Sequence, residues 1–466
     1  MVIAGCSCVL VFSAAVGASS LASANPGGTN ISSEQPPDDV LAKIGTPLPL
    51  PAGVDTDPTG TAIKNAAHEL AGADFGDFYH DGDVYYLGFT RDAERYLTEV
   101  QKQFPGVQMH AYVTPRGIDE LDAISQEIES TMLSADPDGQ ILYAVPNQQA
   151  GVVEVGVQDP NAQLPAGSSL AIALAPQAAS SQPESPTLAQ ALVAKYGETV
   201  KVVQDEPLQP TSAASLTLSD PSSVTADAAP GADTYVDPMQ GGRGIYSPNR
   251  YCTAGFMYRG PAYIVNGKIV KSSERGVISA GHCFLGQAPT TNWYQGKQLL
   301  GYYARQGTVN PSRCDCGTVK TKDELITDRE VSDQVFRVPG QTPFTITDIQ
   351  GLNFGNRGDR VCISAAVSGY QCGTLHTGGR GNVFTLHFEG HTYHILGVHS
   401  AYFPRPFKAG DSGAPVFNPY GKKSDAFGLG IYFADSPSIP KKAYFSQAYN
   451  VQAQLNVSIC TKSNPC

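Results

Sequence analysis

The segment FKAGDSGAPVF, residues 407–417, places an acid and a serine between glycines inside an apolar run. Gly-Asp-Ser-Gly is ordinary turn chemistry, so one interpretation is a tight turn with no further role. The other interpretation makes Ser412 a nucleophile, because Gly410 would let backbone N–H groups converge on an oxyanion. The segment alone does not separate the two interpretations, so the other residues of a catalytic set must be sought elsewhere.

A serine nucleophile requires a base that accepts its proton and an acid that orients the base. No histidine follows His399, and Ala414 stands at the last glycine position of the G-x-S-x-G pattern, so the α/β-hydrolase order is excluded. The base must therefore precede Ser412. His282 in GVISAGHCF is the best candidate, because it follows an apolar, strand-like run that would hold the imidazole at its end.

The candidate orienting acid is Asp315, in SRCDCGTVK, at the start of a second strand-like run. Alternation along a strand puts Cys314 and Cys316 on one face and Asp315 on the other, so the carboxylate can face a histidine. Asp333, in VSDQVF, is the rival acid, but the charged run around it is typical of a solvated insertion. The order His, Asp, Ser on an all-β domain is the chymotrypsin arrangement.

Composition divides the chain into parts. Residues 1–24 contain an apolar run and end in ASA, which predicts a secretory signal peptide and an exported protein. No later run reaches the length of a membrane span, so no membrane partner is expected. Apart from two cysteines in the signal, all cysteines follow residue 251, and an even number in an exported chain predicts disulfides there.

Charge divides at the same place. Residues 1–249 hold 9 Lys and Arg against 30 Asp and Glu, whereas residues 250–466 hold 22 against 13. The basic residues of the second part are scattered rather than clustered, which argues against a nucleic-acid partner. Opposite net charges instead favour docking of the two parts on each other.

The organisation along the chain follows these differences. Residues 25–60 are rich in Pro, Gly and Asp and are expected to be flexible. From 61 to 206 helical and strand-like patterns alternate, which predicts a small α+β domain, with one helix in TRDAERYLTEVQKQF opened by Thr90. Residues 207–241 have the composition of an exposed, cleavable linker. From 242 to 466 short β-rich runs between Gly, Pro and Asn predict an all-β sandwich or barrel.

From about residue 242 to 455 the chain resembles the streptogrisin and α-lytic type of secreted bacterial chymotrypsin-fold serine proteases. Five motifs in the family's order carry the resemblance: GGRGIYSPNRYCTAGF at the mature N-terminus, ISAGHC, CDCGTVK, RVCISAAVSGYQCGTL at a disulfide loop, and GDSGAP. The resemblance implies an all-β double β-barrel catalytic domain, preceded by a small α+β pro-domain.

The same motifs imply roles for individual residues. His282 is implied as the general base, Asp315 as its orienting acid and Ser412 as the nucleophile. The backbone N–H groups of Gly410 and Ser412 are implied to form the oxyanion hole. The resemblance also implies the disulfides Cys252–Cys283 and Cys362–Cys372. Four further cysteines have no family template, and either local pairing or a link from the Asp315 strand to the C-terminus is open to them: Cys314, Cys316, Cys460 and Cys466.

The run LHFEGHTYHILGVHS brings five potential metal ligands close together in sequence, namely His387, Glu389, His391, His394 and His399. The run lacks metalloprotease spacing, and alternation around a glycine is typical of a hairpin. No metal and no other cofactor is therefore expected.

The segment before the nucleophile bears on substrate preference. Trypsin-like members of the family carry an acid there, whereas FPRPFKAGDSG supplies Arg405 and Lys408 and no acid. The specificity pocket is therefore not expected to prefer Lys or Arg. The segment GLGIYFAD is expected to line this pocket with Ile431, Tyr432 and Phe433, whose bulk would shorten or close it.

The sequence thus predicts a secreted serine endopeptidase, made as a pro-enzyme, that acts as a monomer on protein or peptide substrates. The resemblance implies that residues 25 to about 240 assist folding and then inhibit the product, and the alternative for this region is a permanent accessory domain that binds substrate or cell wall. Cleavage is expected in the linker, with a mature start near Gly241 to Tyr246. Two alternatives remain open: a catalytically impaired homologue that binds peptides or partners on the same fold, and an exported esterase with the same triad.

Overall fold

The computed structural model describes residues 46–47, 57–175, 185–210, 229–265, 268–307, 312–322, 329–351, 355–377, 381–420 and 424–466. The predicted signal peptide, nearly all of the predicted flexible segment and residues 211–228 of the predicted linker lie outside the described residues. Within these ranges strands predominate, so the chain is mostly β. None of the helices described combines the length and the apolar character needed to cross a bilayer.

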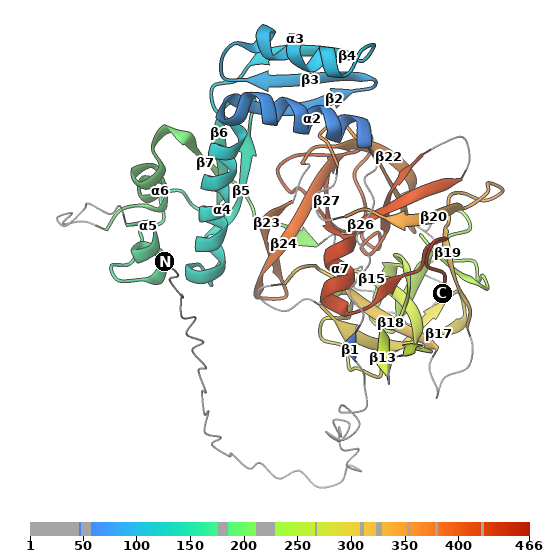
Figure 1. Ribbon diagram of the computed structural model, residues 1–466. Helices are drawn as coiled ribbons and strands as arrows, with labels where there is room; N and C mark the ends of the chain where they lie inside the picture. The colour runs from blue at the N-terminus through green and yellow to red at the C-terminus, as the bar shows by residue number, and fades with distance from the viewer. Residues whose placement is uncertain are drawn as a thin grey trace, which may run out of the picture. The chain divides into compact units, whose positions relative to one another are not determined.

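The acidic part of the chain, residues 57–210, alternates helices and strands (Figure 1). A three-stranded sheet of order β2-β3-β4 shares a core with α2 and α3 through residues such as Ile63, Phe89 and Val100. A second run of strands, β7-β6-β5, shares a core with α4, α5 and α6 through residues such as Leu121 and Leu192. The elements are α2 Pro58–Ala71, η1 Gly72–Asp74, β2 Phe75–Asp81, β3 Val84–Phe89, α3 Ala93–Gln103, β4 Gln108–Val113, α4 Ile118–Ala135, β5 Ile141–Asn147, β6 Val152–Val157, α5 Ser169–Leu174, α6 Leu188–Tyr196, η2 Gly197–Thr199, β7 Val200–Gln204 and β8 Gln209–Pro210.

The rest of the described chain, residues 229–466, is built from strands, with one helix near its end. An eight-stranded sheet has the order β11-β10-β16-β17-β18-β15-β12-β28, and a short sheet pairs β1 with β13 and β14. The first strands are β1 Thr46–Pro47, β9 Met239–Gly241, β10 Gly244–Ser247, β11 Arg250–Thr253, β12 Met257–Arg259, β13 Ala262–Val265, β14 Lys268–Lys271, β15 Arg275–Ser279, β16 Asn292–Gln295, β17 Gln298–Gln306 and β18 Gly317–Lys322, with η4 Gly281–Phe284 after β15.

A second, larger sheet contains the strands that follow. Its path is β7-β6-β5-β23-β24-β22-β21-β25-β26-β20-β19-β9, with β27 pairing β24 and β26, and β8 pairing β26. The remaining elements are β19 Val331–Val335, β20 Phe344–Ile349, β21 Arg360–Ala365, β22 Gly369–Leu375, β23 Asn382–Phe388, β24 His391–Tyr402, β25 Pro415–Pro419, β26 Asp425–Asp435, β27 Lys442–Gln447, α7 Ala448–Leu455 and β28 Ser458–Ile459.

The acidic part contacts the β-rich part directly. Tyr143 on β5 pairs with Phe384 on β23, so the strands β7-β6-β5 continue the larger sheet. At another point the Arg357 guanidinium pairs with the Asp77 carboxylate. Both contacts join residues that lie more than 200 positions apart in the sequence, and the ion pair joins opposite charges.

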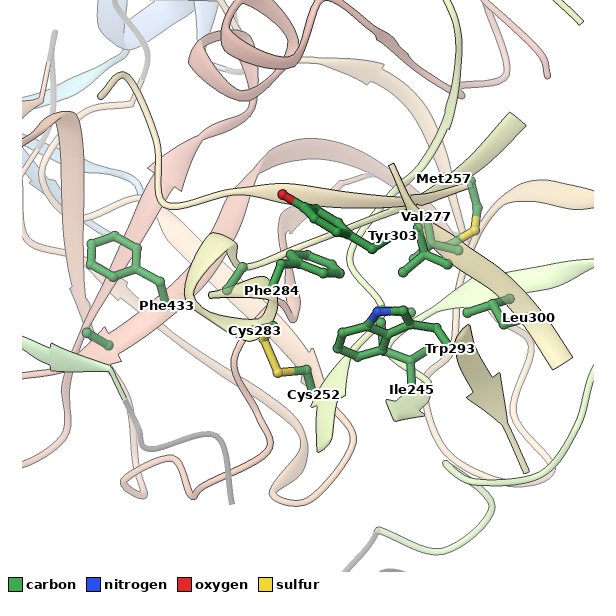
Figure 2. Packing of buried hydrophobic residues seen from close by; sticks show 14 of the residues in the cluster. Ile245, Cys252, Met257, Val277, Cys283, Phe284, Trp293, Leu300, Tyr303 and Phe433 are labelled. Atoms are coloured by element: carbon green, nitrogen blue, oxygen red, sulfur yellow. A yellow bond between two sulfur atoms is a disulfide. The ribbon is translucent and has the colours of Figure 1, made fainter. Parts of the chain in front are cut away.

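A buried aromatic cluster supports the turn that carries His282. Trp293 is fully buried, and its ring lies 4.9 Å from the ring of Phe284, which in turn stacks on Tyr303 at 5.1 Å. Figure 2 shows the disulfide Cys252–Cys283 beside these rings. Phe284 and Cys283 both belong to η4, so a packed core and a covalent bond hold this short turn in place.

The stretch in which a mature start is predicted lies inside paired strands. β9 pairs in parallel with β19, and β10 pairs in antiparallel fashion with β11. Just upstream, Ala232 and Met239 are fully buried. The predicted start from Gly241 to Tyr246 thus falls among packed strands, and the cleavage position itself stays a prediction.

Candidate active site

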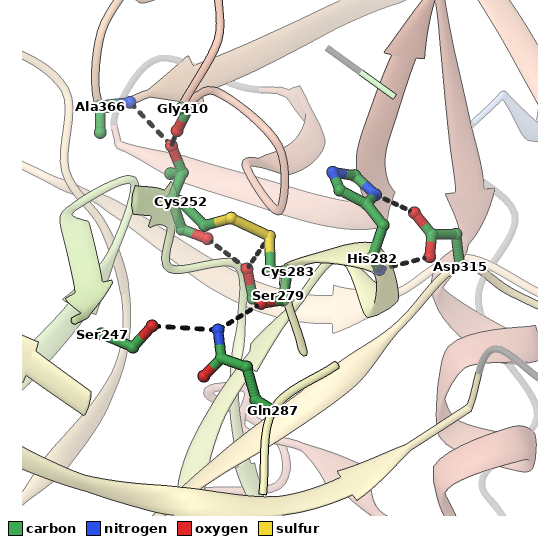
Figure 3. The surroundings of a disulfide bond; sticks show 10 residues. Ser247, Cys252, Ser279, His282, Cys283, Gln287, Asp315, Ala366 and Gly410 are labelled. Carbon is green, nitrogen blue, oxygen red and sulfur yellow. Dashed lines mark hydrogen bonds and ion pairs between the residues drawn. A yellow bond between two sulfur atoms is a disulfide. The ribbon is translucent and has the colours of Figure 1, made fainter. Parts of the chain in front are cut away.

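The imidazole of His282 and the carboxylate of Asp315 are in direct contact (Figure 3). His282 lies in η4 directly after β15, and Asp315 precedes β18, which pairs with β15. Oδ2 of Asp315 lies 2.5 Å from Nδ1 of His282, and its Oδ1 accepts a 2.8 Å hydrogen bond from the His282 main-chain N–H. A proton on Nδ1, donated to Asp315, leaves Nε2 as the nitrogen that can act as a base.

Ser412 lies in the loop between β24 and β25, and Thr253 ties this loop to the strand that leads to His282. The N–H of Thr253 donates to the carbonyl of Ser412 at 2.8 Å, and its Oγ1 donates to the carbonyl of Gly410 at 2.8 Å. The hydroxyl of Ser279, three residues before His282, donates to the Thr253 carbonyl at 2.8 Å. These bonds bring the serine loop and the histidine turn together.

Two glycines of the serine loop have no room for a side chain. Gly410 and Gly413 have φ angles of 95° and 92°, which disfavour any residue with a Cβ. A Cβ on Gly413 would lie 2.0 Å from Oγ of Ser279 and 2.3 Å from the Thr253 carbonyl oxygen. The glycines flanking Asp411 and Ser412 therefore allow the loop to approach the histidine strand this closely.

Asp411 holds the serine loop from the other side. Its buried carboxylate accepts N–H groups of Val367 and Ser368 at 2.9 Å each and of Lys408 at 2.7 Å. Burial raises the pKa of Asp411, and the hydrogen bonds from these donors oppose that rise. The side chain thereby fixes the loop against the turn after β21.

The predicted catalytic residues are buried in this form of the chain. His282, Asp315 and Ser412 are all 0% exposed. Nε2 of His282 has no hydrogen-bond partner within the part of the chain that the structure describes. The structure therefore brings His282 against Asp315 and the Ser412 loop against Ser279.

The rival candidates lie elsewhere. Asp333 is in β19, where burial raises its pKa, and the carboxylate that contacts His282 is that of Asp315. The candidate metal ligands His387, Glu389, His391, His394 and His399 belong to the hairpin of β23 and β24. His394 and His399 lie 2.9 Å from the main-chain carbonyls of Asp136 and Thr377, and Glu389 pairs with Arg250.

The predicted pocket residues differ in exposure. Arg405 and Lys408 are exposed, whereas Ile431, Tyr432 and Phe433 are fully buried in β26. The hydroxyl of Tyr432 donates to a carboxylate three residues on, Asp435, at 3.0 Å. The other oxygen of Asp435 accepts the N–H of Phe407 at 3.0 Å, so a partly buried acid does lie beside the segment that precedes the nucleophile. Sequence reasoning passed over Asp435 because it looked for an acid only before the nucleophile.

Thr253 and Ser446 are the other supporting residues that sequence reasoning missed. The Ser446 hydroxyl accepts the main-chain N–H of Asp315 at 3.0 Å. Thr253 directly follows Cys252, so its place in a motif was a usable signal. Ser446 lies more than 130 residues from Asp315 in sequence, and no local pattern marks it.

The structure pairs all the cysteines of the β-rich part. Cys252 is joined to Cys283 and Cys362 to Cys372, the two pairs that the resemblance implies. The other four pair locally, Cys314 with Cys316 and Cys460 with Cys466. The disulfide Cys314–Cys316 joins the residues on either side of Asp315, so it constrains the acid that contacts His282.

No protein-family model and no curated protein sequence matches the chain. Solved structures similar to it include Thermobifida fusca Protease A, with 22% identity, a TM-score of 0.35, and 48% of this chain and 98% of that chain covered. Cellulomonas bogoriensis chymotrypsin has 18% identity, a TM-score of 0.34, and 48% and 98% covered. A Nocardiopsis protease has 18% identity, a TM-score of 0.33, and 47% and 97% covered. At these identities and TM-scores the likenesses decide neither family nor activity.

Proposed function

We propose that the chain is a secreted serine endopeptidase of chymotrypsin type, made as a pro-enzyme with an α+β pro-domain ahead of a double β-barrel. The contact between His282 and Asp315 carries the proposal. The buried carboxylate accepts the Nδ1 proton of the imidazole and so orients the ring. A general base requires this orientation, because it leaves Nε2 free of a proton. The N–H of Thr253 donates to the Ser412 carbonyl, and the Thr253 carbonyl accepts a hydrogen bond from Ser279 on β15, the strand that leads to His282.

In this proposal Oγ of Ser412 attacks the carbonyl carbon of a peptide bond while Nε2 of His282 takes the hydroxyl proton. N–H groups of Gly410 and Ser412 stabilise the oxyanion. His282 then passes its proton to the leaving nitrogen as the C–N bond breaks. Water hydrolyses the resulting ester and returns the serine.

The pro-enzyme part of the proposal rests on the contacts between the acidic and basic parts. The acidic part adds strands to the larger sheet through β5 and forms ion pairs with the β-rich part. The export part rests on the apolar N-terminus ending in ASA and on the cysteine pairs of the β-rich part.

The test is labelling with a fluorophosphonate, followed by peptide mapping, together with cleavage of a denatured protein substrate. The wild-type protein, once processed, should form an adduct at Ser412 and cut the substrate. Ser412→Ala should do neither, and His282→Ala should lose both by several orders of magnitude while remaining folded. An adduct at another serine, or full activity in Ser412→Ala, would reject the proposal.

A second candidate is a catalytically impaired homologue that binds peptides. The observation in its favour is the complete burial of Ile431, Tyr432 and Phe433, which leaves no side-chain pocket lined by them. Such a protein would bind peptides but form no Ser412 adduct, so the same labelling experiment separates it from an enzyme.

A further inference from the structure

A cavity of about 250 Å³ has walls from both the acidic part and the β-rich part. The acidic part contributes residues of α2, β2, α4, β5 and β6, and the β-rich part contributes residues of β23, β27 and the loops before β21 and after β22. The cavity is separate from the proposed catalytic set, because His282, Asp315 and Ser412 are not among the described residues that line it. Pockets for drug-sized ligands hold roughly 300–1,000 Å³, so this cavity suits a smaller molecule.

Lys442, the first residue of β27, brings a buried ammonium group to the cavity wall. The residue is 9% exposed. Among the described residues its Nζ lies 5.5 Å from the centre of the Tyr444 ring but has no hydrogen-bond or ion-pair partner. Burial lowers the pKa of Lys442 to about 8, although the carboxylates of Glu154 and Asp205 oppose this shift. A buried charge is costly without a direct partner, so the cavity favours a ligand that supplies one.

Lys64 of α2 brings a second ammonium group, from the acidic part. Within the described ranges its Nζ also has no hydrogen-bond or ion-pair partner, and burial lowers its pKa despite two nearby carboxylates. His376 on the β-rich wall lies in the same positive field. Burial, together with the charges of Lys442 and Arg357, lowers the pKa of His376 to about 4. At neutral pH this histidine is therefore uncharged, and the two lysines provide the positive charge.

Two carboxylates at the cavity wall are engaged by other side chains. Asp77 accepts hydrogen bonds from the Arg357 guanidinium and from the Tyr112 hydroxyl. Glu154 pairs with Lys201 at 3.2 Å. These acids therefore offset the charges of the two cavity lysines only at a distance, and a small anion inside the cavity would meet them directly.

We propose that this cavity is a binding site for a small oxyanion, a phosphate or a carboxylate, held by the ammonium groups of Lys442 and Lys64. An ammonium group is a compact point charge that suits either oxyanion. Because the two lysines come from different parts of the chain, an anion held by both would join the acidic part to the β-rich part. A ligand that binds only the docked arrangement stabilises that arrangement by mass action. The site therefore adds to the proposed function a control of docking by a small ligand.

The test measures the binding of inorganic phosphate and, separately, of succinate by calorimetry. It uses Ser412→Ala protein that retains the acidic part, with sodium chloride holding the ionic strength constant. Lys442→Met should raise the Kd about 10- to 100-fold, because it removes a hydrogen bond to a charged group. The matched control is Lys441→Met, which removes the same charge from the exposed neighbouring residue and should change the Kd less than about 3-fold. Lys64→Met repeats the comparison from the other wall and should weaken binding to a similar degree.

The tighter of the two ligands identifies the source of the oxyanion as a phosphate or a carboxylate group. Saturable binding of either ligand that Lys442→Met and Lys64→Met weaken, and that Lys441→Met retains, supports the site. No binding of either ligand at about 10 mM would overturn it. An unchanged Kd in the two cavity variants would overturn it as well. Binding is measured without turnover, so these results do not depend on whether Ser412 is a nucleophile.

Hydrogen exchange tests the link to docking. The His80 N–H of the acidic part donates to the Arg357 carbonyl of the β-rich part at 3.0 Å. Its protection factor should rise about 10-fold when the preferred anion is present at ten times its Kd. Lys442→Met should remove this rise, and Lys441→Met should keep it. Saturating anion that leaves the protection factor unchanged would overturn the control of docking.

Discussion

The carboxylate of Asp315 is buried without access to water, and its stability there depends on donors. It accepts a hydrogen bond from the main-chain N–H of His282 and contacts Nδ1 of the same residue. The main-chain N–H of Asp315 in turn donates to the hydroxyl of Ser446. A buried carboxylate is tolerated only with such partners. The same contacts that satisfy the charge also fix the tautomer and direction of the imidazole.

We expect Asp315→Asn to lower kcat about 10⁴-fold, because an amide favours the wrong tautomer of His282 while preserving the shape of the site. The control is Asp333→Asn, which removes a carboxylate in β19 and should leave kcat within about 2-fold. The measurement is the rate of cleavage of a denatured protein substrate. The assignment of the acid is wrong should the two variants exchange these results.

Gly413 is expected to be indispensable because conformation and space both exclude a side chain. Gly413→Ala should reduce activity more than about 100-fold, since its Cβ would displace Ser279 or Thr253, which position the serine loop. The control Gly390→Ala shares a positive φ, 79°, but nothing lies within 4 Å of its Cβ. It should cost only about 1–2 kcal/mol of folding free energy. Comparable losses of activity in both variants would contradict this account.

At the scale of elements, the end of β26 carries a titrating group. Burial raises the pKa of Asp435 from 3.8 to about 6, although Phe407 and Tyr432 donate hydrogen bonds to it. Between about pH 4 and pH 6 the folded chain therefore binds more protons here than the unfolded chain. Its contribution to stability is complete below about pH 4 and is lost as the pH rises through about 6.

We expect the free energy of unfolding of the wild type, relative to Asp435→Asn, to fall by about 2–3 kcal/mol from pH 4 to pH 7. Urea unfolding in a Ser412→Ala background measures this difference without self-cleavage. A difference that does not change with pH would show that Asp435 titrates outside this window.

Local patterns and distant contacts differ in how far sequence predicts them. The periodicity of TRDAERYLTEVQKQF predicts a helix, and α3 indeed buries Ala93, Tyr96, Leu97 and Val100 on one face. The predicted N-cap is wrong: Asp92 precedes the helix, and the Thr90 hydroxyl instead donates to Asp74. A local rule could not foresee that partner, which lies sixteen residues upstream.

The same contrast applies to the site. His282, Asp315 and Ser412 each carry a recognisable flanking pattern, so sequence could nominate them. Pairing of β8 with β26 joins residues more than 200 positions apart, and neither partner has a pattern that names the other. Such contacts depend on the folding of the whole chain, which is why the structure shows them and the sequence does not.

At the scale of the whole molecule, one histidine links the acidic part to the β-rich part. Nε2 of His80 lies 2.7 Å from the Asp359 carboxylate, and Nδ1 lies 3.0 Å from the Gly82 carbonyl. The Asp57 carboxylate lies close by, with an oxygen within 4.8 Å of a ring nitrogen of His80 and of a carboxylate oxygen of Asp359. Both ring nitrogens face acceptors, so both contacts are made only when the ring carries two protons.

The hydrogen bond to Asp359 raises the pKa of His80, so the docked arrangement binds more protons than an undocked one. Docking should therefore be strongest below the ordinary histidine pKa of 6.5 and weaken as the pH rises above it.

The His80 N–H, which donates to the Arg357 carbonyl at 3.0 Å, reports docking through hydrogen exchange. In Ser412→Ala protein, its protection factor should fall as the pH rises from 6 to 9. His80→Gln should remove that dependence, whereas His68→Gln, whose partner Asp119 lies within the acidic part, should retain it. The same pH slope in His80→Gln would show that this histidine does not control docking.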